Sequence, residues 1–320
     1  MRHLSALALA SVVHLLTLAF AAVGAWAVLR EPGSLVSWLV GVPALAIGWG
    51  LRPRLGRLPA DAEVLDRSIA PELYAAAARV ADRVGVPWPE KIAVRDLATR
   101  TCYERVGLRR RPVLVVGLPL WLALPPALRV ALLATAYARL PTGGERMVGE
   151  ALTTLETWRD ALLEAAKPLR ARQDAHTAIT ASSLGAVGQP GTTYEVAGLL
   201  GRLLGRVFGG PVLLARYALA RLDGADEPRA RARQRALALR AAPERELDRL
   251  EELAADGGYL APMQSAALRG LSAAAIRQDA LARSGSCDSA ELLDAAGSEL
   301  IDRELKACYS RAIGGFGLIS

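Results

Sequence analysis

The sequence predicts an α+β protein that is predominantly α-helical. Two long uncharged stretches, Leu4–Leu29 and Ser34–Leu51, predict a transmembrane helical hairpin over residues 1–52. The remainder, residues 53–320, predicts one globular domain, because three short strand-like runs fall between residues 91 and 116 and the rest has helical periodicity. These strands predict a small antiparallel sheet.

The first uncharged stretch is longer than the ~20 apolar residues that cross a bilayer. A signal peptide is an alternative, since Ala25–Ala27 reads Ala-Trp-Ala, but its length and the second stretch behind it favour a membrane helix. Ser34–Leu51 is a shorter span that Pro43 would kink. His14 is expected to pack as a neutral imidazole between the two helices.

The charges that flank the hairpin predict its orientation. Arg2 precedes the first span, and three arginines follow the second, namely Arg52, Arg54 and Arg57. By the positive-inside rule both ends lie in the cytoplasm. We therefore expect a multi-pass protein of the cell membrane, with the bilayer as a partner and a cytoplasmic globular domain. Lys and Arg number 39 against 32 Asp and Glu, which suits an anionic membrane surface. No arginine cluster alternates with aromatic residues, so we expect no nucleic-acid partner.

The globular domain opens with an amphipathic helix over Pro71–Val84. The strands are predicted at Lys91–Arg95, Thr101–Val106 and Val113–Val116. Pro125-Pro126 then opens a helix whose Val130–Ala138 part is apolar on nearly all sides, which predicts a buried core helix.

Further helices are predicted along the rest of the chain. Their ranges are Glu145–Arg172, Glu195–Ala220, Glu244–Asp256, Pro262–Arg283 and Ala290–Ile313. Loops are predicted at Ala181–Thr193 and Ser284–Asp288. The Glu195–Ala220 helix fits packing on the core or lying in the membrane interface equally well.

The run VLVVGLPLWLALPPALRVALLA, which starts at Val113, resembles the membrane-bound zinc metallopeptidases of family M48, the HtpX and Ste24 group. In that family the strand leads into a helix with H-E-x-x-H, whose two histidines bind zinc and whose Glu is the general base. Here Thr135 and Arg139 stand at the two histidine positions, and Ala136 stands at the Glu position. The resemblance therefore implies a zincin-like fold that has lost its catalytic motif.

Two further parts of the resemblance concern the third ligand and the substrate cleft. The family places a Glu ligand and a supporting Asp on a later helix, and Arg231 and Arg235 match those positions. It also lines its cleft with an Asn-Ala segment, near which Thr101 and Cys102 fall, followed by Tyr103. An edge at Thr101–Tyr103 would bind an extended protein or peptide segment by strand addition; a plain hairpin is the alternative.

The spacing of the histidines, considered without the resemblance, also predicts no zinc site. The three histidines are His3, His14 and His176, and no two have ligand spacing, so we expect no cofactor. We expect a non-catalytic binding or regulatory pseudopeptidase. One alternative is a zinc-dependent endopeptidase that cleaves membrane or misfolded proteins through an unconventional metal site. A sensor of anionic lipids is the other alternative.

Arginines gathered at the lost metal site would need counter-charges, open water or an anionic ligand. We predict that the helix around Thr135 packs against the helix around Arg231. We also predict that Arg139 or Arg231 reaches a carboxylate across the gap, with Glu150 or Glu156 as its partner.

Overall fold

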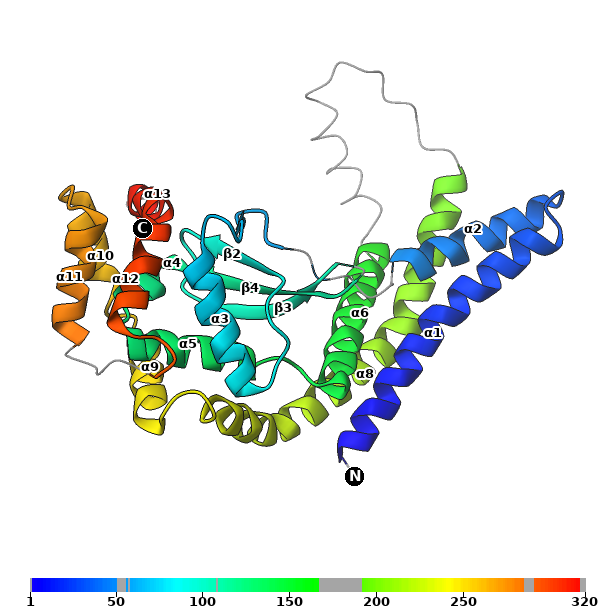
Figure 1. Cartoon of the computed structure of the whole chain (residues 1–320). Helices are drawn as coiled ribbons and strands as arrows, with labels where there is room; N and C mark the ends of the chain where they lie inside the picture. Colours follow the sequence, from blue (N-terminus) through cyan, green and yellow to red (C-terminus); the bar gives the residue numbers. More distant parts are fainter. Residues whose placement is uncertain are drawn as a thin grey trace, which may run out of the picture. The chain divides into compact units, whose positions relative to one another are not determined.

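The computed structural model describes residues 2–50, 56, 58–107, 109–166, 192–284 and 291–316. The chain forms two compact units (Figure 1). The hairpin unit contains Met1–Arg54 and Pro141–Glu227, and the sheet unit contains Leu55–Leu140 and Pro228–Ser320. The predicted boundary at residue 52 lies close to the first break. Residues 141–227, however, group with the N-terminal helices and not with the rest of the predicted 53–320 domain.

Two helices, α1 (Arg2–Arg30) and α2 (Leu35–Gly50), form the predicted hairpin. Glycines allow their close contact: a Cβ atom on Gly24 would lie 2.8 Å from the carbonyl oxygen of Gly41. Within the described residues, only α1 is long and apolar enough to cross a membrane. The prediction of two spans was wrong in this respect, because α2 has 16 residues and falls short of the ~20 that a span needs.

The other helices of the hairpin unit are α6 (Gly143–Ala166) and α8 (Thr192–Ala238), the latter ending in the sheet unit. Small and apolar side chains of α1, α6 and α8 share a buried cluster. His14 lies against α6, with its Nε2 atom 3.2 Å from the carbonyl oxygen of Met147. The predicted loop Ala181–Thr193 lies outside the described residues up to residue 191, and α8 begins at Thr192.

A four-stranded sheet with the order β1-β2-β4-β3 forms the centre of the sheet unit (Figure 1). Its strands are β1 (Glu63–Leu65), β2 (Lys91–Arg95), β3 (Cys102–Val106) and β4 (Arg111–Gly117). The prediction of an antiparallel sheet was wrong, because β2 and β4 are parallel and the sheet is mixed. The physical reason is the run Val113–Val116, which is buried throughout and therefore takes a central place between β2 and β3.

Helices surround this sheet and complete the core. They are α3 (Pro71–Val84), α4 (Leu118–Ala123), α5 (Pro126–Ala138), α9 (Glu244–Asp256), α10 (Leu260–Leu268), α11 (Ala273–Ser284), α12 (Ala295–Glu304) and α13 (Lys306–Phe316). The predicted bounds of α3 and α9 are confirmed, and α5 is buried on nearly all sides as predicted.

The last two predicted helices are each divided. The predicted helix Pro262–Arg283 is interrupted at Gly270, whose φ of 72° only glycine adopts without strain. The predicted helix Ala290–Ile313 is interrupted at Leu305, between α12 and α13. The predicted loop Ser284–Asp288 lies outside the described residues after Ser284, which ends α11.

Candidate functional site

A cavity of about 370 Å³ in the sheet unit gathers four of the eight site positions that the sequence singled out. Thr101, which precedes β3, lines it together with Thr135, Ala136 and Arg139 of α5. The opposite wall comes from α9, which contributes Glu251 among other residues. The cavity therefore lies between a sheet edge and two helices, as a ligand cleft would.

A single glycine holds the segment before β3 at this cavity. Gly117 ends β4, and a Cβ atom there would lie 2.2 Å from the carbonyl oxygen of Ala98 and 2.9 Å from that of Arg100. Only a residue without a side chain lets these two backbones cross so closely. The Gly117 amide also donates to Oγ1 of Thr101 at 3.3 Å. These contacts fix Arg100 and Thr101 at the rim and wall of the cavity.

Two tyrosines fix α5 against β3. The rings of Tyr103 and Tyr137 meet edge to face, with 4.8 Å between their centroids. Each hydroxyl donates to a backbone carbonyl, that of Tyr103 to Pro87 at 2.6 Å and that of Tyr137 to Ala77 at 2.9 Å. Burial raises the pKa of both phenols, so both stay protonated at neutral pH. Tyr103, predicted as a cleft residue, is therefore buried in the core and does not line the cavity.

Cys102 lies on the opposite face of the sheet. Its neighbours there are the buried Ala93, Val113 and Val115. Burial, together with the nearby Glu104 carboxylate, raises the pKa of the Cys102 thiol to about 11. The thiol is thus protonated at neutral pH and is a poor nucleophile. Of the three predicted cleft residues, only Thr101 lines the cavity.

The charged side chains that line the cavity are mainly cationic. The side chains of Arg100 and Arg139 are exposed, and neither has an ion pair or hydrogen bond with any residue that the structure describes. Thr135 donates to the carbonyl oxygen of Ala131 at 2.8 Å, so its hydroxyl oxygen can still accept a hydrogen bond. Two guanidinium groups therefore remain available to an anionic ligand.

Arg235 lies next to this cavity through α9. Its guanidinium contacts three α9 carboxylates, with distances of 3.0 Å to Glu244, 2.5 Å to Asp248 and 3.9 Å to Glu251. Hydrogen bonds to Asp248 and Glu244 raise its pKa further above neutrality. Arg231 lies four residues earlier on α8 and does not line the cavity.

Glu150 and Glu156, the predicted partners of Arg139 or Arg231, contact other arginines. Glu150 lies 3.7 Å from Arg146, and Glu156 lies 3.7 Å from Arg216, all four within the hairpin unit. The helices that pack most extensively against α5 are α3 and α9. Consequently α9, and not the segment around Arg231, supplies the wall opposite Thr135 and Arg139.

The donors of this cavity do not suit a catalytic zinc. Its lining offers hydroxyl groups, two guanidinium groups and the carboxylate of Glu251, whereas such a site needs three His, Cys, Asp or Glu ligands. Among the described residues, no group of three or more such side chains is placed to hold a metal ion. A positively charged cavity instead favours an anionic ligand.

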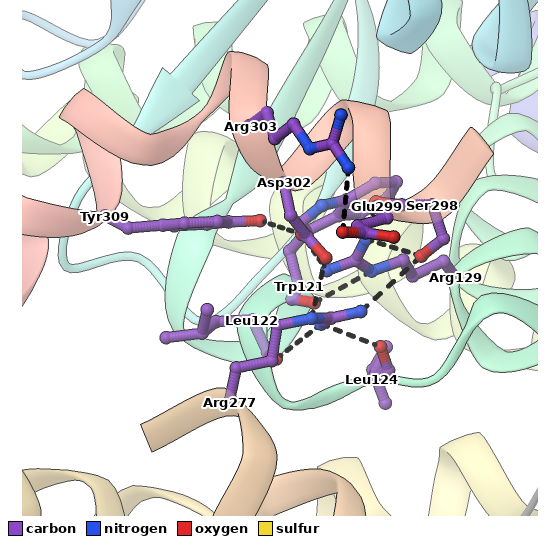
Figure 2. Close-up of polar contacts among 10 residues, drawn as sticks. All are labelled: Trp121, Leu122, Leu124, Arg129, Arg277, Ser298, Glu299, Asp302, Arg303 and Tyr309. Carbon is purple, nitrogen blue, oxygen red and sulfur yellow. Dashed lines mark hydrogen bonds and ion pairs between the residues drawn. The ribbon is translucent and has the colours of Figure 1, made fainter. Parts of the chain in front are cut away.

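Sequence reasoning missed a buried charged cluster around Arg129 of α5 (Figure 2). Arg129 is completely buried and forms an ion pair of 2.6 Å with Asp302. Arg277 contacts the other oxygen of the same carboxylate, Oδ2, at 2.6 Å. The Tyr309 hydroxyl donates at 2.8 Å to Oδ1, the oxygen that Arg129 contacts. Burial, together with the positive charge of Arg129, lowers the pKa of Arg277 to about 10. The one available signal was a charged residue, Arg129, within an otherwise apolar helix.

Comparisons of the chain with family models, with curated proteins and with solved structures find no match.

Proposed function

We propose that this protein is a membrane-associated, non-catalytic relative of the M48 peptidases that binds an extended acidic peptide segment. The observation that carries the proposal is the cavity shared by Thr101 and by Thr135, Ala136 and Arg139. The M48 resemblance implies that these positions surround one cleft, and they lie around one cavity. Their side chains supply neither zinc ligands nor a general base, which supports binding without hydrolysis.

The edge strand β3 supports recognition of an extended chain. β3 occupies one end of the sheet order and pairs with β4 on one side. Arg105 lies opposite Pro112 of β4. Pro112 has no N–H, and its carbonyl accepts a hydrogen bond from the amide of Glu90, on the side of β4 away from β3. The backbone groups of Arg105 therefore point away from β4, and so do those of Tyr103 two residues before. Gly56 already lies against the carbonyl of Arg105, since a Cβ atom on Gly56 would be 3.0 Å from that oxygen. A peptide strand could therefore pair with the backbone groups of Tyr103.

The charges favour an acidic segment. Arg100 precedes β3, and Arg139 ends α5 at the same cavity. Guanidinium groups recognise carboxylates through paired hydrogen bonds, which makes them suitable for Asp or Glu side chains or a free C-terminus.

The hairpin unit supports attachment to a bilayer. The helix α1 has the length and composition of a membrane span, which a signal sequence near an N-terminus shares. Large apolar side chains remain exposed on both hairpin helices, among them Trp26, Leu29, Leu35 and Trp49. Exposed apolar surface of this kind is typical of contact with lipid. We propose that α1 anchors the protein in a membrane and that the exposed apolar side chains of α2 contact the lipid beside it.

Binding of a labelled peptide tests the proposal. The probe is a peptide of about eight residues that alternates Val and Asp, compared with the same peptide containing Lys in place of Asp. We expect the full chain to bind the acidic peptide and not the basic one. Arg139→Gln and Arg100→Gln should each weaken binding about tenfold, because a charge-assisted hydrogen bond contributes about 1.5–3 kcal/mol. The control Arg269→Gln removes an exposed arginine elsewhere in the sheet unit. Equal affinity for both peptides would reject acidic specificity.

Zinc analysis and a cleavage assay test the alternative, a zinc-dependent endopeptidase with an unconventional metal site. We expect no stoichiometric zinc in the purified protein and no cleavage of unfolded casein. One equivalent of zinc together with cleavage that a chelator stops would replace our proposal with the enzymatic one.

A further inference from the structure

A second cavity, of about 770 Å³, lies in the sheet unit among α11, α12, α13 and the end of α4. Its volume is within the ~300–1,000 Å³ of small-molecule sites. Apolar side chains form one part of its lining, including Leu271, Leu281 and Ile313. Charged side chains form another part, so the cavity has two chemically different walls.

The charged wall continues into the buried cluster of Figure 2. Asp302 and Arg277 line the cavity, and Arg129 lies behind them with no exposed surface. A single carboxylate, that of Asp302, thus faces two guanidinium groups. Arg277 directs another nitrogen to the carbonyl oxygens of Leu122 and Leu124, at 2.9 and 3.3 Å. These carbonyl oxygens accept hydrogen bonds from Arg277 but carry no negative charge. The two guanidinium groups therefore exceed the one carboxylate by one positive charge.

Lys306 adds a second uncompensated charge. It is exposed, lines the cavity at the start of α13, and has no ion pair or side-chain hydrogen bond to any described residue. The remaining charges of the lining are Arg303 and Glu299, which pair with each other at 2.9 Å. The charged wall, with Arg129 behind it, therefore has four cationic and two anionic groups.

We propose that this cavity binds an amphiphile with one anionic head group and a single acyl chain. The head group lies between Lys306 and Arg277, and the chain lies along Leu271, Leu281 and Ile313. A small inorganic anion would leave the apolar wall in contact with water, and an uncharged lipid would leave the cationic wall without a counter-charge. Only a ligand that carries both features matches both walls. This proposal is independent of the peptide-binding cavity.

Titration calorimetry with three probes tests the inference. The full chain is held in neutral maltoside micelles and titrated with dodecanoate, dodecanol or inorganic phosphate, and titrations of empty micelles are subtracted. We expect saturable binding of dodecanoate. Dodecanol, which has the chain without the charge, should bind at least tenfold more weakly, and phosphate should show no saturable binding at the same concentrations. Phosphate binding as tight as that of dodecanoate would show a site for free anions and would overturn the proposal. Dodecanol binding as tight as dodecanoate would overturn it as well.

Two variants and a matched control locate the binding. Lys306→Gln removes an exposed charge and should weaken dodecanoate binding about tenfold. Leu271→Gln should weaken it through the apolar wall. Lys91→Gln removes a similarly exposed lysine of β2 that lies outside the cavity, and it should bind like the unaltered protein. No saturable dodecanoate binding, or equal affinity of Lys306→Gln and Lys91→Gln, would refute the proposal.

Discussion

The ring of Tyr103 in β3 meets the ring of Tyr137 in α5 edge to face, at an interplanar angle of 79°. This contact joins β3 to α5, the helix whose Thr135, Ala136 and Arg139 line the cavity that Thr101 also lines. Both hydroxyl groups are hydrogen-bonded to backbone carbonyls, so neither side chain can leave its position without losing a hydrogen bond.

Tyr137→Phe should lower the free energy of unfolding by about 1 kcal/mol, because the Ala77 carbonyl loses its donor. Tyr137→Ala should cost about 3–5 kcal/mol through the cavity that it leaves. Chemical denaturation of the full chain measures both. Tyr217→Phe alters an exposed tyrosine and should change stability by less than about 0.5 kcal/mol. Equal effects of Tyr137→Phe and Tyr217→Phe would contradict the anchoring role.

Gly117→Ala should destabilise the sheet unit by about 1–3 kcal/mol, because the new methyl group would overlap the carbonyl of Ala98. The same substitution should also weaken binding of the acidic peptide, since Arg100 and Thr101 would shift. Gly314→Ala is the matched control. Gly314 lies in α13 with open space around it, so alanine there should be neutral or slightly stabilising. Thermal unfolding and peptide titration check the pair.

Asp302→Asn should cost about 3–5 kcal/mol, because it leaves Arg129 and Arg277 buried without a counter-charge. Glu299→Gln, on the same helix, breaks only an exposed ion pair with Arg303 and should cost about 0–0.5 kcal/mol. Urea denaturation distinguishes the two. Similar midpoints for both variants would show that the buried cluster contributes little to stability.

The raised pKa of Cys102 predicts a pH dependence. The native thiol keeps its proton up to about pH 11, whereas the unfolded thiol loses it near pH 9. The native state therefore binds more protons between these values, and its stability should fall as pH rises through them. Alkylation of Cys102 in the native protein should be slow at pH 8 and rise toward pH 11. The variant Cys102→Ala should lose part of the fall in stability, and an unchanged pH profile would contradict the assigned cause.

Two histidines placed on α5 should create a metal site. In Thr135→His with Arg139→His, both imidazoles lie on one face of the helix, and Glu251 lines the same cavity as a third ligand. We expect zinc binding by calorimetry in this double variant and not in the unaltered protein. Adding Glu251→Gln should weaken binding at least tenfold. A different result would contradict this arrangement. If Arg231→Glu strengthened zinc binding and Glu251→Gln left it unchanged, the helix around Arg231 would form the wall opposite α5, as first predicted from the sequence.

Local structure in this chain could be predicted from the sequence because local signals decide it. Proline at the start and glycine after the end define α3 over Pro71–Val84, and the β-branched run at Val113–Val116 defines a buried strand. The pairing of the strands could not be read in the same way, because strand order depends on which edges each strand must bury. The unbroken apolar character of Val113–Val116 was nevertheless a signal for a central strand.

Contacts between residues that are far apart in the sequence could not be predicted from it. The Arg129–Asp302 pair joins residues 173 positions apart, and no local pattern links them. The wall opposite Thr135 was expected near Arg231 but is formed by α9, because spacing along the sequence does not determine which of several amphipathic helices reaches a given face.

The largest buried side chains of α5 do not line the cavity of Thr135 and Arg139. Leu128, Leu133 and Tyr137 are buried in the core, whereas Thr135 is partly exposed and Arg139 is exposed. Substitutions at the last two positions therefore change what the cavity recognises at little cost to folding. Natural variation can accordingly alter ligand preference here in single steps, each of which leaves a folded protein for selection to act on.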